Sequence, residues 1–153
     1  MVRLSCTVWA CVRPVMVAAQ NVAPCEGDAD VQSLVEPWED HIRSYANGAV
    51  RLALLDTIEP ATGSLRILVL TPPYRDDGNR HCFVVGWTEN QGFVTLDFAG
   101  LTPTYDPVTG LAVGVQARFF DEALNFSNIG ILDVVINQAT GEVRAGFTVT
   151  GRE

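Results

Sequence analysis

The chain has 153 residues with 18 acidic and 10 basic side chains, so its formal net charge is −8 at pH 7. An acidic surface repels phosphate backbones, and nucleic acid is therefore not an expected partner. All 10 basic residues are arginine, which also excludes lysine chemistry such as Schiff-base formation. The length suits one domain with a core of ordinary size.

Residues 1–19 have the layout of a secretory signal peptide. Arg3 supplies a positive charge, Leu4–Val12 forms an apolar core, and the small residues Val17–Ala19 suit a cleavage site. We therefore expect an exported protein, periplasmic or secreted, whose mature chain is a single β-domain of residues 20–153.

Arg13 argues against this interpretation, because a charge beside the apolar core opposes its entry into a membrane. The alternative is that the segment is the ordinary N-terminus of a cytosolic protein. A membrane anchor is not expected, since spanning takes roughly 20 apolar residues, and so the mature chain has no stable membrane insertion. Loss of Arg3 and Arg13 with the signal peptide would take the net charge from −8 to −10.

The four cysteines divide between these two parts of the chain. Cys6 and Cys11 lie in the signal peptide, and Cys25 and Cys82 lie in the mature domain. An even number of cysteines in an oxidising compartment favours a disulfide. We expect one bridge, between Cys25 and Cys82, that fixes an N-terminal arm to a central strand.

The arm that follows Cys25 contains signals for a short helix. Asp28 or Asp30 provides an N-cap for a helix within residues 28–36, and Pro37 ends it. We therefore expect a β-domain that is preceded by a short N-terminal helix or arm.

Residues 38–46 allow two interpretations. Asn47-Gly48 is a strong signal for a two-residue hairpin turn, which would pair residues 42–46 with residues 49–53. The competing structure is a helix over residues 37–46 that ends at Gly48. We favour the hairpin.

From about residue 41 onward, short apolar runs alternate with turn signals and show no sustained helical period, which predicts an all-β fold. The runs predict seven strands, and residues 42–46 would add an eighth. An antiparallel meander of seven or eight strands must hide its edges, so we expect a barrel or a two-layer sandwich. The predicted strands are Val50–Thr57, Leu65–Thr71, Cys82–Thr88, Phe93–Phe98, Leu111–Phe120, Ile129–Asn137 and Val143–Val149.

One turn pattern recurs between these strands. Residues 59–63, 106–110 and 137–141 all end in Thr-Gly, and the last two begin with Asp106 and Asn137, whose side chains suit acceptance of turn N–H groups. The pattern predicts tight connections between antiparallel neighbours.

The longest polar loop, residues 72–81, is the first candidate binding site, because binding residues favour such loops. A second candidate is an open end of the domain near Trp87. The candidate binding residues are therefore Tyr74, Arg75, Asp76, Asp77, Asn79, Arg80, His81 and Trp87.

No metal or cofactor site is expected. Asp76, Asp77 and Asn79 lack the alternating ligands and distant Glu of an EF-hand loop. His41 and His81 are the only histidines, and their spacing does not indicate a zinc site. Nucleotide-binding and hydrolase motifs are absent from the sequence.

These observations favour a soluble acidic module of the cell envelope or periplasm that binds a small molecule or a protein. Two alternatives stay open. The first is a small hydrolase that uses a carboxylate pair, drawn from Asp97, Asp121, Glu122 and Asp133. The second is a structural accessory protein.

Overall fold

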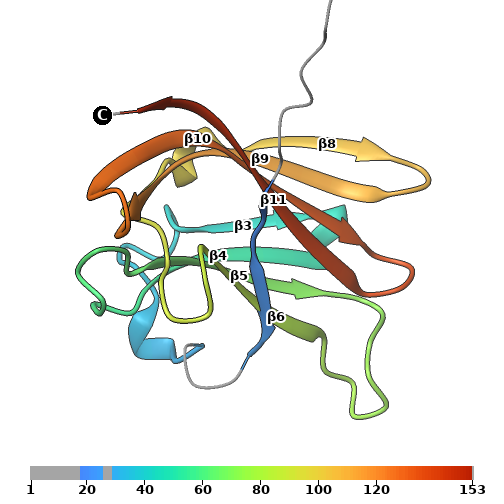
Figure 1. Cartoon of the computed structure of the whole chain (residues 1–153). Coiled ribbons are helices and arrows are strands. Elements are labelled where there is room, and N and C mark those ends of the chain that lie inside the picture. Colours follow the sequence, from blue (N-terminus) through green and yellow to red (C-terminus); the bar gives the residue numbers. More distant parts are fainter. Residues whose placement is uncertain (1–17, 26–28, 153) are drawn as a thin grey trace, which may run out of the picture.

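The protein is a two-layer β-sandwich, shown in Figure 1 as a computed structural model that describes residues 18–25 and 29–152. The all-β prediction is confirmed, and of the two predicted closures the sandwich is the one observed. In one sheet the strand order is β2 (Asn21–Pro24), β6 (His81–Gly86), β5 (Leu65–Thr71), β4 (Val50–Asp56) and β3 (Ile42–Tyr45).

The other sheet has the order β1 (Ala18–Ala19), β11 (Glu142–Arg152), β10 (Phe126–Asn137), β9 (Gly110–Asp121) and β7 (Thr95–Leu96), and β8 (Thr102–Asp106) also pairs with β9. All strand pairs are antiparallel. The predicted meander is present as two runs of sequential neighbours, β3 to β6 in one sheet and β8 to β11 in the other.

The core lies between the sheets, because alternate residues of each strand point inward and are apolar. Leu68–Leu70 and Phe83–Val85 belong to β5 and β6, which have a neighbour on both sides, as their continuous apolar runs predict. The fully buried side chains of the core include Val50, Leu52, Ile67, Val69, Val85, Phe93, Val113, Val115, Leu132, Ile136 and Phe147.

Three parts of the prediction need correction. The strand predicted for Phe93–Phe98 is reduced to β7 and is followed by a 3₁₀ turn, η3 (Phe98–Gly100). The helix predicted within residues 28–36 is only a 3₁₀ turn, η1 (Val31–Ser33), with Asp30 as its N-cap. Strand β8 was not predicted, because its residues are polar and exposed and include Pro103, a residue that edge strands tolerate.

The favoured hairpin at residues 42–53 is confirmed and the alternative helix is wrong. β3 pairs with β4 from Ile42 opposite Ala53 to Tyr45 opposite Val50. Asn47 and Gly48 have the positive φ, 55° and 83°, that a type I′ turn requires. Ala46 also has a positive φ, 51°, so four residues, 46–49, join the strands and not the predicted two. This turn lies within a short 3₁₀ segment, η2 (Ala46–Gly48).

The N-terminal strand joins the two sheets, and Figure 1 shows it in blue crossing from one layer to the other. β1 pairs with β11, and β2 pairs with β6. The predicted disulfide is present: Cys25 and Cys82 have Cα atoms 5.3 Å apart, and the Cys25 N–H donates to the Cys82 carbonyl at 3.1 Å. The predicted signal peptide lies outside the described residues except for its last two, which form β1.

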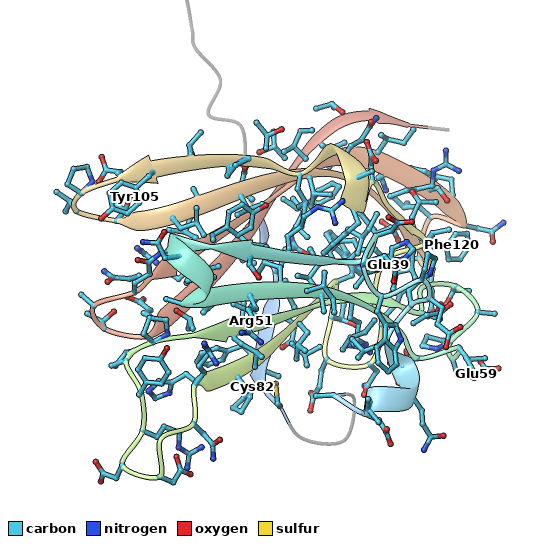
Figure 2. All side chains as sticks on the ribbon, turned by 180° about the vertical axis from the view of Figure 1, so that it is seen from behind. Glu39, Arg51, Glu59, Cys82, Tyr105 and Phe120 are labelled. Atoms are coloured by element: carbon cyan, nitrogen blue, oxygen red, sulfur yellow. A yellow bond between two sulfur atoms is a disulfide. The ribbon has the colours of Figure 1, made fainter. Side chains whose placement is uncertain are left out.

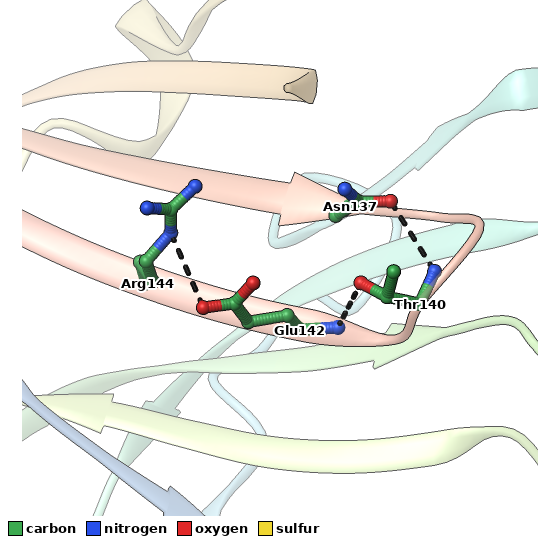
Figure 3. Close-up of polar contacts among 4 residues, drawn as sticks. All are labelled: Asn137, Thr140, Glu142 and Arg144. Atoms are coloured by element: carbon green, nitrogen blue, oxygen red, sulfur yellow. Dashed lines mark hydrogen bonds and ion pairs between the residues drawn. The ribbon is translucent and has the colours of Figure 1, made fainter. Parts of the chain in front are cut away.

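Two of the three recurrent turns, those that begin with Asn137 and Asp106, use the predicted side-chain caps. The prediction of a tight turn is wrong for residues 59–63, which lie in a longer connection between Asp56 and Leu65, where Gly63 lacks the positive φ of Gly110 and Gly141. Asn137 accepts from the backbone N–H of Thr140 (Figure 3) and from that of Ala139, and Gly141 has a φ of 77°. The carboxylate of Asp106 accepts from Thr109 and Val108, and these hydrogen bonds lower the pKa of Asp106.

A third turn of this type connects β9 to β10. Asp121 accepts from the N–H groups of Ala123 and Leu124, and Asn125 takes the positive φ, 53°, that glycine provides elsewhere. The sequence pattern did not reveal it, because Leu124-Asn125 stands where the other turns have Thr-Gly.

Candidate functional site

The two candidate binding regions lie at opposite ends of β6. His81 begins this strand and Trp87 follows its last residue, Gly86. Six residues of strand separate them by about 20 Å. The loop at residues 72–81 and the region of Trp87 are therefore two separate sites.

The loop at residues 72–80 extends beyond the sheets (Figure 1), and hydrogen bonds within it join Asn79 to Arg75 and to Asp77. Arg75 N–H donates to the Asn79 carbonyl at 2.8 Å. Hydrogen bonds from the Asn79 backbone and side chain lower the pKa of Asp77. An open depression of about 400 Å³ lies beside Arg75, Asp76, Asp77 and His81.

Arg80 ties this loop to the rest of the sandwich. Its guanidinium donates to the carbonyls of Ala49 at 2.9 Å and Gly48 at 3.2 Å, and lies 5.3 Å from the centre of the Tyr74 ring. These contacts give Tyr74 and Arg80 a structural role in the folded loop.

The stronger candidate is a cleft of about 540 Å³ beside Trp87. Three connections line it: β4–β5, β6–β7, and the end of β9 with the turn into β10. Their lining residues are Pro60, Trp87, Thr88, Asn90, Gln91, Phe120, Asp121 and Glu122. Figure 2 shows Phe120 and Glu59 toward this end of the molecule and Tyr105 toward the other.

Trp87 is held in place by an aromatic cluster that continues into the core. Its indole stacks on Phe119 with ring centres 3.4 Å apart and planes inclined by 13°. Phe147 and Phe93 meet it edge-on at 5.6 Å and 6.4 Å. Because Phe119 covers one face of the half-buried indole, a ligand in the cleft would contact the opposite face or the ring edge.

Gln91 fastens the three connections to one another. Its side-chain amide donates to the Thr62 carbonyl at 3.3 Å and to the Phe120 carbonyl at 3.1 Å. Within its own loop, its carbonyl accepts from Thr88 N–H at 2.8 Å. The cleft is thus formed by loops that hydrogen bonds already hold in position.

Arg66 lies beside the connection between β6 and β7 and is only 4% exposed. A Cβ placed on Gly86 would lie 2.7 Å from its Nη1 and 3.2 Å from the carbonyl oxygens of both Gln91 and Thr88. The guanidinium therefore lies beside backbone carbonyls of the loop.

The four carboxylates named as possible catalytic pairs divide between two places. Asp121 and Glu122 line the Trp87 cleft. Asp97 and Asp133 line a groove of about 400 Å³ on the outer face of the other sheet, with Thr102, Thr104 and Gln116. Asp97 accepts from Gly100 N–H at 3.2 Å, and desolvation by partial burial raises the pKa of Asp133.

Metal binding finds no support in the part of the chain that the structure describes: no three His, Cys, Asp or Glu side chains come together there. His41 lies against the Pro37 carbonyl, with its Nδ1 at 3.0 Å. Within residues 18–25 and 29–152, no helix has both the length and the apolarity to cross a membrane.

Comparisons with protein-family models, with curated proteins and with solved structures found no match. The cleft residues that sequence reasoning missed are Pro60, Thr88, Asn90, Gln91 and Phe120. Asn90-Gln91-Gly92 has the composition of a turn, and nothing in its pattern indicates that Gln91 reaches two other connections.

Proposed function

We propose that the protein is an exported binding module and that its ligand occupies the Trp87 cleft. The observation that carries the proposal is the cleft itself: a concave site of about 540 Å³ with an aromatic wall and several polar groups. Sites for small molecules have this size and are usually formed before the ligand arrives, although most of them have a more apolar lining than this cleft. The disulfide supports the export part of the proposal, because such bonds persist in oxidising compartments.

The fixed geometry of the loops favours binding at this end over the loop at residues 72–81. Trp87 packs on Phe119, and Gln91 bridges two neighbouring connections. A ligand would therefore pay little conformational entropy for ordering the site.

Amide and indole NMR signals test the proposal. In the expected mature chain Trp38 and Trp87 are the only tryptophans, so a Trp38→Phe variant identifies the Trp87 indole N–H. In a screen of small soluble compounds, a ligand should shift this signal and the side-chain amides of Asn90 and Gln91. Ligands that shift only residues 72–81, or a screen that never shifts the Trp87 indole, would contradict the proposal.

A second candidate function is hydrolysis at the groove of Asp97 and Asp133. It is favoured by one observation, that a carboxyl with a raised pKa shares a groove with another carboxylate, as in glycosidases. Aryl glycosides are suitable substrates for a test. Turnover that Asp133→Asn abolishes and Asp121→Asn retains would support hydrolysis, and no turnover by the unmodified protein would contradict it.

A further inference from the structure

The connections around the Trp87 cleft carry negative charge only. Residues 57–64, 87–94 and 121–125 contain Glu59, Glu89, Asp121 and Glu122, and they contain no arginine or histidine. Two of these four carboxylates, Asp121 and Glu122, line the cleft directly. A cleft lined by charge of one sign concentrates ligands of the opposite sign.

Several basic groups lie at the far end of the sandwich. Arg75 and Arg80 belong to the loop between β5 and β6, and His81 begins β6. Arg144 forms an ion pair with Glu142, at 3.5 Å, next to the β10–β11 turn (Figure 3). This end also carries Asp76, Asp77 and Asp106, so its charges are of mixed sign, whereas the connections around the cleft carry charge of one sign only.

Among the arginines whose side chains the structure describes, Arg66 and Arg118 lie nearer to the cleft, and neither lines it. Arg66 is buried behind Gly86 and is not among the residues that line the cleft. Arg118 lines a different depression on the outer face of the sheet, with Asp97 and Gln116. The groups that a ligand would meet in the cleft are therefore rings, amides, a hydroxyl and carboxylates.

We propose that the Trp87 cleft binds a small organic cation with an alkylated ammonium group. The inference rests on the proposed function and adds the class of ligand. Tryptophan offers the best face for a cation among the aromatic residues, and quaternary ammonium groups are commonly bound in this way. Glu122 adds a carboxylate, while Asp121 has one oxygen engaged by its own turn.

The same lining disfavours two other ligand classes. A hard metal ion takes six to eight oxygen ligands, whereas this cleft has two carboxylates beside apolar rings. A neutral ligand would fit the rings but would gain nothing from the charge. An alkylated ammonium can interact with the rings, because it is weakly hydrated, and with the carboxylates, because it carries a positive charge.

Choline and its neutral isostere 3,3-dimethyl-1-butanol are matched probes, because they share their shape and differ in charge. Titration of each into the full exported protein, followed through the Trp87 indole signal, measures both affinities. We expect choline to bind at least about tenfold more tightly, and its affinity to fall as salt is added.

Glu122→Gln removes one charge from the exposed rim without changing its shape. We expect this variant to weaken choline binding severalfold and to leave binding of the neutral probe unchanged. Glu142→Gln is the matched control, because this carboxylate lies at the other end of the sandwich, and it should leave both affinities unchanged.

The outcomes separate the two proposals. Equal binding of both probes at Trp87, or binding of other compounds but not choline, overturns the cation inference and leaves the binding module standing. Choline binding that is insensitive to Glu122→Gln also overturns the inference. If no compound shifts the Trp87 indole, the proposed function fails together with the inference.

Discussion

The Cys25–Cys82 disulfide should supply a large share of the stability of this domain. The two cysteines are 57 residues apart in the sequence. Closing a loop of that length reduces the entropy of the unfolded chain by an amount worth about 4 kcal/mol at 25 °C. For a domain of this size, that corresponds to a decrease of roughly 10–15 °C in Tm.

Replacing both cysteines with serine tests this magnitude. The substitution leaves the pairing of β2 with β6 available, including the Cys25 N–H to Cys82 carbonyl hydrogen bond, so the folded state should be retained. Thermal unfolding followed by circular dichroism, with and without reductant, measures the change. Reductant should lower the Tm of the unmodified protein toward that of the double variant and should not affect the variant.

Two results would refute the reasoning. One is a double variant with the Tm of the unmodified protein. The other is a Tm of the unmodified protein that does not respond to reductant, together with free thiols found at Cys25 and Cys82 by mass spectrometry.

Three further substitutions test local features of the fold. Gly110→Ala should lower the free energy of unfolding by several kcal/mol, because the new Cβ would lie 2.3 Å from the Ile136 carbonyl oxygen. Gly78 has a similar φ, 81°, with open space around it, so Gly78→Ala should lower it by only about 1–2 kcal/mol. Equal losses in urea unfolding would contradict this. Burial raises the pKa of Asp133, so the unmodified protein loses stability as pH rises above the ordinary carboxyl value. The Tm of Asp133→Asn minus the Tm of the unmodified protein should therefore increase from pH 3 to pH 7. Hydrogen bonds lower the pKa of Asp106, so Asp106→Ala should lose Tm at pH 7 and lose less at pH 2–3; Tm differences that do not change with pH would contradict both assignments.

Much of the sandwich could be predicted because its strands alternate between apolar and polar residues. Leu111 to Phe119 shows this pattern plainly, and Asn47-Gly48 identified the first hairpin. β8 escaped prediction because an exposed strand that packs nothing has no apolar signal to detect: all five of its residues are exposed. Its position depends on pairing with β9, which is a tertiary contact.

The candidate site was only partly predictable for a related reason. Trp87 could be named as a residue near an open end, but Pro60 and Phe120 lie about 30 residues from it on either side in the sequence. They meet it only because β4–β5, β6–β7 and β9–β10 connect strands at the same end of two packed sheets. The polar loop at residues 72–81 was named for its composition. In the structure the side chains of Asp77 and Arg80 form hydrogen bonds within the protein, whereas Arg75, Asp76 and His81 line an open depression.

The most direct test of ligand binding at Trp87 is an intermolecular nuclear Overhauser experiment with choline at a saturating concentration. The account predicts contacts from the choline N-methyl protons to the ring protons of Trp87 in the cleft. Contacts to Tyr74 or Trp38 in place of Trp87, or no intermolecular contact at all, would contradict it.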